Sequence, residues 1–307
     1  MSSHRDLSSE PQADSQPLRV GVVVATLGRS EDCAVLMECL SKQTQRPSAI
    51  VVSAEKASDL PENLPSDGRV VLGPRGLCAQ RNRGVAEIAA ACDVIVFYDD
   101  DYLPASRSIA GLAELFSAAP DVVGATGRVL ADGVTQGGIS LPEAFRILAE
   151  AEAQPPEPVR IERDLKSAYG CNMAFRVSAM AGLAFDERLP LYGWQEDVDY
   201  AGQIVKVGRV VQTNAMVGVH RGVIGARTPG ARLGFSQIVN PLYLVRKGTM
   251  RRTHAASIML ANLLANHAKA LAPERHIDRI GRMRGNWRGL AHVLRGRMDP
   301  LEMLNID

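Results

Sequence analysis

The sequence contains few cysteines, no long apolar run and no apolar stretch near its N-terminus. Its five cysteines are an odd number among 307 residues, and none forms a CxxC pair. This favours buried free thiols in a reducing compartment over a disulfide framework. No stretch reaches the roughly 18 to 20 apolar residues that a membrane-spanning helix needs. Residues 1–17 are rich in Ser, Pro, Gln and acidic side chains, so we expect a disordered tail and no secretory signal.

The net charge of the whole chain is small, but its distribution is uneven. Residues 231–307 contain 13 Lys and Arg against 5 Asp and Glu, a net charge of +8 within a chain of net charge +1. The remaining residues, 1–230, therefore carry −7. A basic segment attached to an acidic body suggests an anionic partner for that segment.

Apolar runs alternate with helical patterns in the first hundred residues. The runs are long enough for buried strands and occupy residues 19–28, 48–55, 69–73 and 93–99. Strands that alternate with helices predict an α/β fold with a mixed, mainly parallel sheet flanked by helices. Ligands bind such sheets beyond the carboxyl ends of the strands, where Thr26 and Ser53 lie.

Three consecutive aspartates, Asp99, Asp100 and Asp101, end the run "VIVFY". Carboxylates this close together repel one another unless a positive charge lies among them. A divalent cation with oxygen ligands would supply that charge. The alternative is a solvated acidic turn that caps a following helix near Pro104.

Five segments come in an order and at spacings that resemble glycosyltransferase family 2. They read "VVVATLGRSE", "GLCAQRNRGVAEIAA", "VFYDDDYLP", "GCNMAFRVSAMAGLAFDERL" and "GWQEDVDYAGQIVKVGRVV". The resemblance covers about residues 19–222 and implies a GT-A (Rossmann-like) catalytic domain over residues 18–230. It also implies inverting transfer of a sugar from a nucleotide diphosphate donor with a Mn or Mg ion. Residues 231–307 would form a basic, amphipathic helical extension.

The resemblance assigns a metal site to the acidic cluster. Asp99 and Asp101 match the outer positions of the DxD motif, in which the first carboxylate contacts the nucleotide and the last holds the metal. Asp100 would assist in nucleotide binding. His220 ends the apolar run "MVGVH" and is either a further metal ligand or a hydrogen-bonded structural histidine.

Inverting transfer needs one general base for the acceptor hydroxyl. Asp197 in "WQEDVD" matches the aspartate that the family uses as this base, and Glu196 would orient it or touch the acceptor. Acidic residues at a helix start also suit the helix dipole, which would make Asp197 replaceable. Trp194 would form an apolar platform for a sugar ring, or would pack in the core.

Further residues match the donor-binding positions of the family. Arg81 and Asn82 correspond to an Arg-Asn pair that would contact the diphosphate or the base. Cys171 and Asn172 follow Gly170 on a small-residue strand beside the donor sugar, although close strand packing is an equal alternative. The sequence departs from the family at Ser53, where an acidic residue often reads the nucleobase, and this leaves the base unassigned. Thr26 remains a candidate base contact.

The C-terminal segment contains two apolar stripes at helical spacing. They comprise Met259, Leu260, Leu263, Leu264 and Leu271, and then Ile280, Met283, Trp287, Leu290 and Leu294, with arginines beside the second stripe. A basic amphipathic helix fits an anionic membrane surface. The alternative is that both stripes pack on the catalytic domain while the arginines face water. The segment contains no nucleic-acid recognition motif, so nucleic acid is not an expected partner.

The leading interpretation is a metal-dependent inverting glycosyltransferase of the cytoplasm, at the inner face of the membrane. It would transfer sugar to a saccharide or lipid-linked acceptor in the synthesis of a surface or exported polysaccharide. The first alternative is a nucleotidyltransferase on a related sheet, but "ATLGRSED" lacks the glycine density of that class. The second is a non-catalytic protein that binds nucleotide or sugar.

Overall fold

The computed structural model describes residues 5–6, 18–223, 228–274 and 276–306. The chain forms two compact units. The first comprises residues 1–75, 80–184 and 204–225, and the second comprises residues 76–79, 185–203 and 226–307. Most of the expected disordered tail, residues 1–4 and 7–17, lies outside the described part of the chain, whereas Arg5–Asp6 form strand β1.

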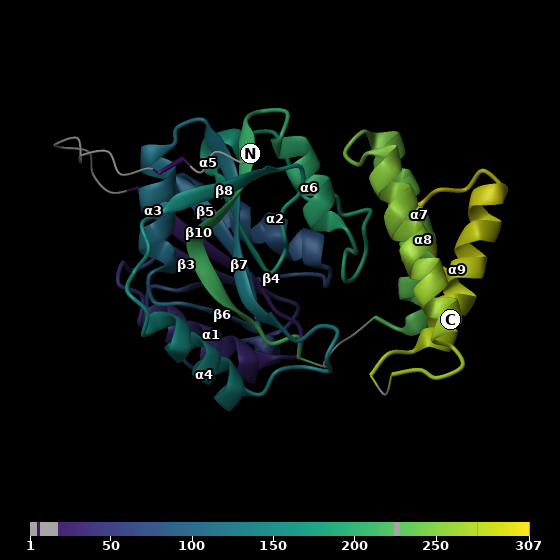
Figure 1. Ribbon diagram of the computed structural model, residues 1–307, viewed down its shortest axis with the longest axis horizontal. Coiled ribbons are helices and arrows are strands. Elements are labelled where there is room, and N and C mark those ends of the chain that lie inside the picture. Colours follow the sequence, from purple (N-terminus) through teal and green to yellow (C-terminus); the bar gives the residue numbers. More distant parts are fainter. Residues whose placement is uncertain (1–4, 7–17, 224–227, 275, 307) are drawn as a thin grey trace. The chain divides into compact units, whose positions relative to one another are not determined.

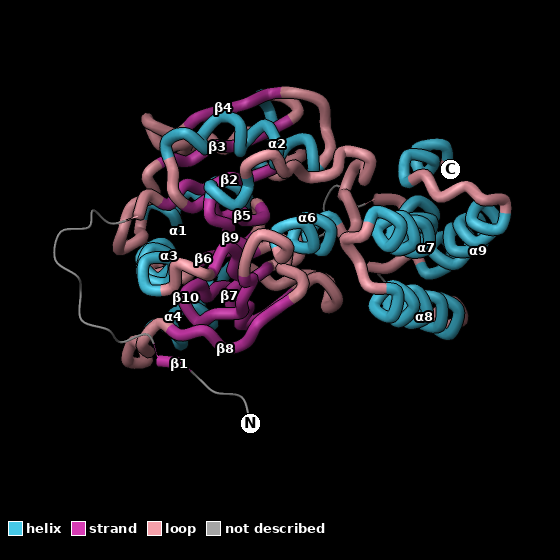
Figure 2. Tube along the Cα trace, turned by 90° about the horizontal axis from the view of Figure 1, so that it is seen from above, coloured by secondary structure: helices cyan, strands magenta, loops and turns pink. Residues whose placement is uncertain are grey.

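The described strands of the first unit form one ten-stranded sheet. Its order is β1-β8-β10-β7-β9-β5-β2-β3-β4, with β6 paired to β10, and Figure 2 shows this sequence of strands from β4 to β8. The bounds of the remaining strands are β2 Val20–Ala25, β3 Ala49–Ala54, β4 Arg69–Leu72, β5 Val94–Asp99, β6 Tyr102–Pro104, β7 Val122–Asp132, β8 Arg160–Leu165, β9 Asn172–Arg176 and β10 Arg209–His220.

Strands β5, β2, β3 and β4 pair in parallel, as the alternation of strands and helices predicts. Val22 in β2 packs in the main hydrophobic core, whereas the neighbouring Val23 meets Gly84 of helix α2 on the opposite face. Because β2, β3 and β5 are buried on both faces, they are continuous apolar runs without a polar alternation, whereas the edge strand β4 is largely exposed. The expected parallel sheet is therefore confirmed for this half.

The other half of the sheet is mixed. Strand β9 lies antiparallel between β5 and β7, and β10 pairs in parallel with β7 but antiparallel with β6 and β8. The register of β6 and β10 sets His220 opposite Tyr102, directly after the three aspartates. This pairing brings the last strand of the sheet to the end of its central strand.

Helices cover both faces of the sheet in the first unit (Figure 1). They are α1 Ser30–Ser41, α2 Leu77–Ile88, α3 Ser108–Ala118, α4 Leu141–Glu152 and α5 Val177–Met180, with the first turn of α2 belonging to the second unit. Helices α1 and α3 contribute Leu36 and Leu112 to the main core. An α/β fold with a mixed sheet flanked by helices is thus confirmed.

The second unit is helical. Its helices are α6 Glu196–Ile204, of which the last residue belongs to the first unit, α7 Gly230–Lys247, α8 Arg252–Ala268, α9 Arg279–Leu294 and the short 3-10 helix Pro300–Asn305. Phe235 and Val239 of α7 form its small core with Met303 and Ile306. None of the helices within the described ranges is long and apolar enough to cross a membrane.

Candidate active site

The acidic cluster, Asp99 to Asp101, lies where the central strand β5 ends. Residues 94–98 are fully buried between β2 and β9, and the chain then turns into β6. The carboxylate side chains of Asp99, Asp100 and Asp101 are 23%, 0% and 2% exposed. This burial is incompatible with the alternative of a solvated acidic turn. Buried carboxylates at such close spacing require positive partners.

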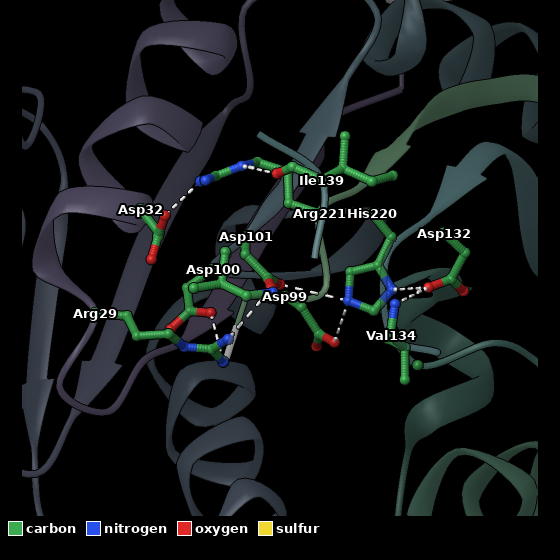
Figure 3. Close-up of polar contacts among 12 residues, drawn as sticks. Arg29, Asp32, Asp99, Asp100, Asp101, Asp132, Val134, Ile139, His220 and Arg221 are labelled. Carbon is green, nitrogen blue, oxygen red and sulfur yellow. Dashed lines mark hydrogen bonds and ion pairs between the residues drawn. The ribbon is translucent and has the colours of Figure 1, made fainter. Parts of the chain in front are cut away.

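Two arginines, Arg29 and Arg81, supply part of that positive charge, and Figure 3 shows Arg29 beside Asp100 and Asp101. Arg29, directly before α1, places its guanidinium nitrogens 2.8 Å from Asp100 Oδ1 and 3.2 Å from Asp101 Oδ2. Arg81 of α2 is buried and lies 3.0 Å from Asp99 Oδ1. Each aspartate of the cluster therefore has a guanidinium neighbour.

His220 ends β10 and points its two ring nitrogens at carboxylates (Figure 3). Its Nε2 lies 3.4 Å from Asp101 Oδ1 and 3.8 Å from Asp99 Oδ2. Its Nδ1 lies 3.3 Å from Oδ1 of Asp132, the last residue of β7. A carboxylate on one ring nitrogen orients a metal-binding histidine so that its other nitrogen faces the ion.

Burial and neighbouring charges shift the pKa values of these groups. Burial raises the pKa of Asp100 above its usual range, and the charges of Asp101 and Asp99 act in the same direction. Burial opposes ionisation of Asp101 too, but His220 and Arg29 outweigh it and hold the pKa of Asp101 below its usual value. Asp100 is thus the carboxyl that most readily takes a proton, and Asp101 stays anionic.

Asp99, Asp101 and His220 can form a metal site. Each offers one ligand atom, and these three atoms lie within 4.8 Å of one another. Asp101 Oδ1 is buried and has no hydrogen bond of normal geometry within the described residues, so it has an unused acceptor position. Carboxylate oxygens suit Mn²⁺ or Mg²⁺, and a neutral imidazole is a common metal ligand. The residues therefore fit a divalent cation.

Thr26 and Ser53 lie at the ends of adjacent parallel strands. The Thr26 amide donates to the Ser53 carbonyl at 3.1 Å. Gln80 Nε2 donates to the Thr26 carbonyl at 2.8 Å and to the Ser53 carbonyl at 2.9 Å. The hydroxyl of Ser53 is buried and has no hydrogen-bond partner among the described side chains and backbone. A buried hydroxyl without a partner is costly unless a ligand uses it.

The residues expected to line the donor sugar pocket lie beside Asp99. The Gly170 carbonyl accepts a hydrogen bond from Arg81 at 2.9 Å, and burial raises the pKa of the Cys171 thiol to about 12. Asn172 is fully buried, and its Nδ2 donates to the Tyr102 hydroxyl at 2.6 Å. These contacts hold Gly170 and Asn172 in place beside Asp99. Donor contacts of Cys171 and Asn172 stay predictions.

The remaining expected residues differ in their surroundings. Asn82 is half-buried on α2. Trp194, Glu196 and Asp197 belong to the second unit, where Glu196 is buried and the other two are half-buried. Asp197 Oδ1 accepts a hydrogen bond from the Val198 amide at 2.8 Å.

The segment that contains Asp197 is attached to the C-terminal helices of the second unit. Asn240 Nδ2 of α7 donates to the Trp194 carbonyl at 2.9 Å. The third acid of the motif, Asp199, is fully buried and pairs with Lys247 Nζ at 2.7 Å and with the Thr249 hydroxyl at 2.6 Å. Asp199 is therefore a structural anchor of this segment.

Several residues near the cluster were not expected from the sequence. Arg29 contacts Asp100 and Asp101, Gln80 contacts the ends of β2 and β3, and Asp132 contacts His220. The Tyr169 hydroxyl donates to Asp132, and its ring lies edge-on to His220 with the centroids 6.0 Å apart. The sequence could have indicated Arg29 and Asp132, because Arg29 follows β2 and Asp132 ends β7 at the ligand-binding edge of the sheet. Tyr169 stands in an irregular segment that gives no such signal.

The mixed sheet with its flanking helices is the GT-A fold, and comparison with solved structures of glycosyltransferases shows the same fold. TarS 1–349 of S. aureus in complex with UDP-GlcNAc matches with a TM-score of 0.53 and 12% identity, over 84% of this chain and 77% of that chain. The same protein in complex with UDP matches with a TM-score of 0.52 and 11% identity, over 84% and 76%. At these identities the likeness establishes the fold alone.

Other comparisons add little. GalNAc-T7 with UDP, GalNAc and Mn²⁺ matches with a TM-score of 0.49 and 15% identity over 92% of this chain and 59% of that chain, which is too distant to carry an argument. This chain spans 44% of a longer TarS structure. No family model matches the sequence, and no curated protein matches it.

Proposed function

We propose that the protein is a metal-dependent, inverting glycosyltransferase that moves a sugar from a nucleotide diphosphate sugar to a hydroxyl acceptor. The observation that carries this proposal is the buried group Asp99, Asp101 and His220 at the end of the central strand of a GT-A sheet. Two of the matching structures hold UDP or UDP-GlcNAc, so uridine diphosphate sugars are the first donors to test.

Asp99, Asp101 and His220 would hold the Mn²⁺ or Mg²⁺ ion. The ion stabilises the charge that develops on a departing diphosphate. Asp132 keeps the His220 ring oriented through Nδ1, so that Nε2 faces the two carboxylates. Membership of glycosyltransferase family 2 would follow from the same arrangement and the five sequence segments.

Donor binding would use the strand ends beside the cluster. Gln80 holds the two strand ends through the Thr26 and Ser53 carbonyls, and the unpartnered Ser53 hydroxyl and Thr26 would contact the nucleoside. Arg81 spans Asp99 and Gly170 and would hold the first carboxylate toward the nucleotide. Asn82, Asp100, Cys171 and Asn172 would complete the pocket.

Asp197 would act as the general base, because inversion requires one group that takes the proton of the attacking hydroxyl. Glu196 would orient the acceptor, and Trp194 would provide an apolar face for a sugar ring. Lys247 and Asn240 support this assignment, since they fix Asp199 and Trp194 on either side of it. A rigid support of this kind suits a residue whose position decides the rate.

The acceptor would be a saccharide or a lipid-linked saccharide in the synthesis of a surface or exported polysaccharide. The basic segment 231–307 supports a location at the cytoplasmic face of a membrane, whose anionic lipids attract positive charge. All five cysteines are free and buried, which fits a reducing compartment.

The test is release of nucleoside diphosphate from a panel of donor sugars with Mn²⁺, with Mg²⁺ or with a chelator. We expect turnover that needs the ion and that falls by about 100-fold or more in Asp197→Asn, because general-base catalysis contributes that much. Asp67→Asn, an exposed acid of the first unit, serves as the control and should keep full activity.

Three outcomes would contradict the proposal or favour another function. Full activity in Asp197→Asn removes the proposed base. Metal-dependent nucleotide binding without turnover of any donor supports the non-catalytic binding protein. Release of pyrophosphate from a nucleoside triphosphate supports the nucleotidyltransferase.

A further inference from the structure

Helix α9 packs against α7 through glycines. A side chain added at Gly285 would lie 2.0 Å from the Ala231 carbonyl oxygen, and one at Gly289 would lie 2.9 Å from Ile238. The backbones of the two helices therefore approach each other closely at these positions. Packing of this kind relies on backbone contact and does not require large apolar side chains between the helices.

Buried amides join the three long helices of the second unit. Asn266 of α8 donates to Asn286 of α9 at 2.9 Å and to Gln237 of α7 at 2.8 Å. Arg279 donates to Asn266 at 3.0 Å, and Asn286 donates to the Gly234 carbonyl at 2.8 Å. The interior between α7, α8 and α9 is thus partly polar and hydrogen-bonded.

The apolar side chains of α8 and α9 lie largely on the outside instead. We call the exposed set, together with Leu271 (95% exposed) from the segment after α8, the α8–α9 surface. On the helices it comprises Leu260 (57%), Leu264 (61%), Ile280 (43%), Trp287 (60%) and Leu294 (87%). The ring of His267, one turn after Leu264, lies 5.7 Å from the Trp287 ring, so the two helices meet within this surface. Five large apolar side chains exposed on two adjoining helices, with Leu271 shortly after the end of α8, are unusual for a surface that faces only water.

The same helices and the segments beside them carry positive charge on their outside. Seven basic side chains are exposed, namely Arg251, Arg252, Lys269, Arg284, Arg288, Arg295 and Arg297. In the described part of 251–306, the exposed acidic side chains include Asp278 and Asp299, and Asp299 is paired with Arg188. Arg288 and Arg295 directly follow Trp287 and Leu294 and therefore flank the apolar row of α9.

We propose that the α8–α9 surface lies on an anionic phospholipid bilayer, with its apolar side chains at the headgroup boundary and its arginines on lipid phosphates. Aromatic and leucine side chains with a basic rim are typical of helices that lie in the plane of a membrane interface. A second copy of the chain would bring two positive surfaces together, so charge favours the anionic bilayer as the occupant. This inference extends the proposed function by naming a partner, and its test does not require turnover.

The experiment is cosedimentation of the full chain with vesicles. One set is an equimolar mixture of phosphatidylglycerol and phosphatidylcholine, and the other is phosphatidylcholine alone. We expect binding to the anionic vesicles that weakens as salt is raised, and about tenfold or more weaker binding to the neutral ones. Light scattering of the protein without vesicles measures self-association in parallel.

Variants locate the contact. Leu264→Gln with Trp287→Gln and Leu294→Gln should weaken binding at least about tenfold, because each side chain loses apolar burial. Leu260→Gln with Leu264→Gln, which leaves the His267–Trp287 contact intact, should weaken it in the same direction. The matched control is Leu72→Gln with Val207→Gln, two exposed apolar residues of the first unit, and it should bind like wild type.

Three results would overturn the proposal. The wild-type chain remains in solution with anionic vesicles, or both surface variants bind as tightly as wild type. Alternatively, the wild-type chain forms dimers that the surface variants abolish, which assigns the surface to a second copy. Thermal unfolding of the variants close to that of wild type shows that any loss of binding is not a loss of folding.

Discussion

Lys247 at the end of α7 contacts two aspartates that lie far from it in the sequence. Its Nζ is 2.7 Å from Asp186 Oδ2 and 2.7 Å from Asp199 Oδ2. The Tyr243 hydroxyl also donates to Asp186, at 2.7 Å. The C-terminal helices are thereby joined to the segment that contains Glu196 and Asp197. Helix α7 of the second unit accordingly supports the segment that carries the proposed base.

We expect Lys247→Met to destabilise the second unit. Asp199 is fully buried, so removing Lys247 leaves its carboxylate with only hydroxyl and amide partners. Lys247 is itself 27% exposed, and water will compensate in part, so we expect a loss of about 2 to 3 kcal/mol in the free energy of unfolding. Urea denaturation measures it.

Asp199→Asn added to Lys247→Met should recover part of that loss, because it removes the buried charge. A loss below about 0.5 kcal/mol in Lys247→Met would show that this ion pair does not hold the segment.

We expect Arg29→Met to tighten the binding of Mn²⁺ to the protein alone by about tenfold, because it removes a positive charge from beside Asp100 and Asp101. The free energy of unfolding without metal should fall, since the two carboxylates lose their counter-ion. Isothermal titration with Mn²⁺ and urea denaturation measure the two effects. Arg46→Met, an exposed arginine of the same unit, is the control. Unchanged or weaker Mn²⁺ binding in Arg29→Met would mean that Arg29 does not compete with the ion.

Gln80→Met should cost about 1 to 3 kcal/mol in the free energy of unfolding, because it removes the donor to the Thr26 and Ser53 carbonyls. It should also weaken nucleotide binding, since these strand ends would no longer be held together. Chemical denaturation and titration with UDP measure both. Gln136→Met, at an exposed position, should change neither value. Wild-type stability in Gln80→Met would contradict the role given to this side chain.

Gly285→Ala should destabilise the protein by about 1 to 3 kcal/mol, because the added methyl group would overlap the Ala231 carbonyl of α7. Thermal unfolding followed by circular dichroism measures it. Arg284→Ala, next in sequence and exposed, is the matched control and should stay within about 0.5 kcal/mol of wild type. Equal stability of the two variants would show that α7 and α9 can move apart at no cost.

Strands β2, β3 and β5 of the parallel half could be predicted because they are buried on both faces. That burial makes each strand a continuous apolar run, and the run ending at Asp99 places the acidic cluster at the ligand-binding edge. The mixed half could not be placed in the same way. Strand β6 has three residues, and its pairing with β10 depends on tertiary contacts that no local pattern records.

The candidate site shows the same limit. The charge of the cluster was evident from Asp99 to Asp101, but its neutralising partner Arg29 comes from a loop about seventy residues earlier. The stripes of α8 and α9 were correct in period, yet the period does not say which face is inside. Glycines and buried amides took the inner positions, and Trp287 therefore lies outside.

The central claim is that Asp99, Asp101 and His220 hold a divalent cation. The most direct measurement is an anomalous difference map at the manganese edge, from crystals soaked with Mn²⁺ and UDP. We predict a peak in contact with these three side chains in wild type and none in Asp101→Asn. A wild-type map without a peak there, with Arg29 still paired to Asp101, would contradict the account.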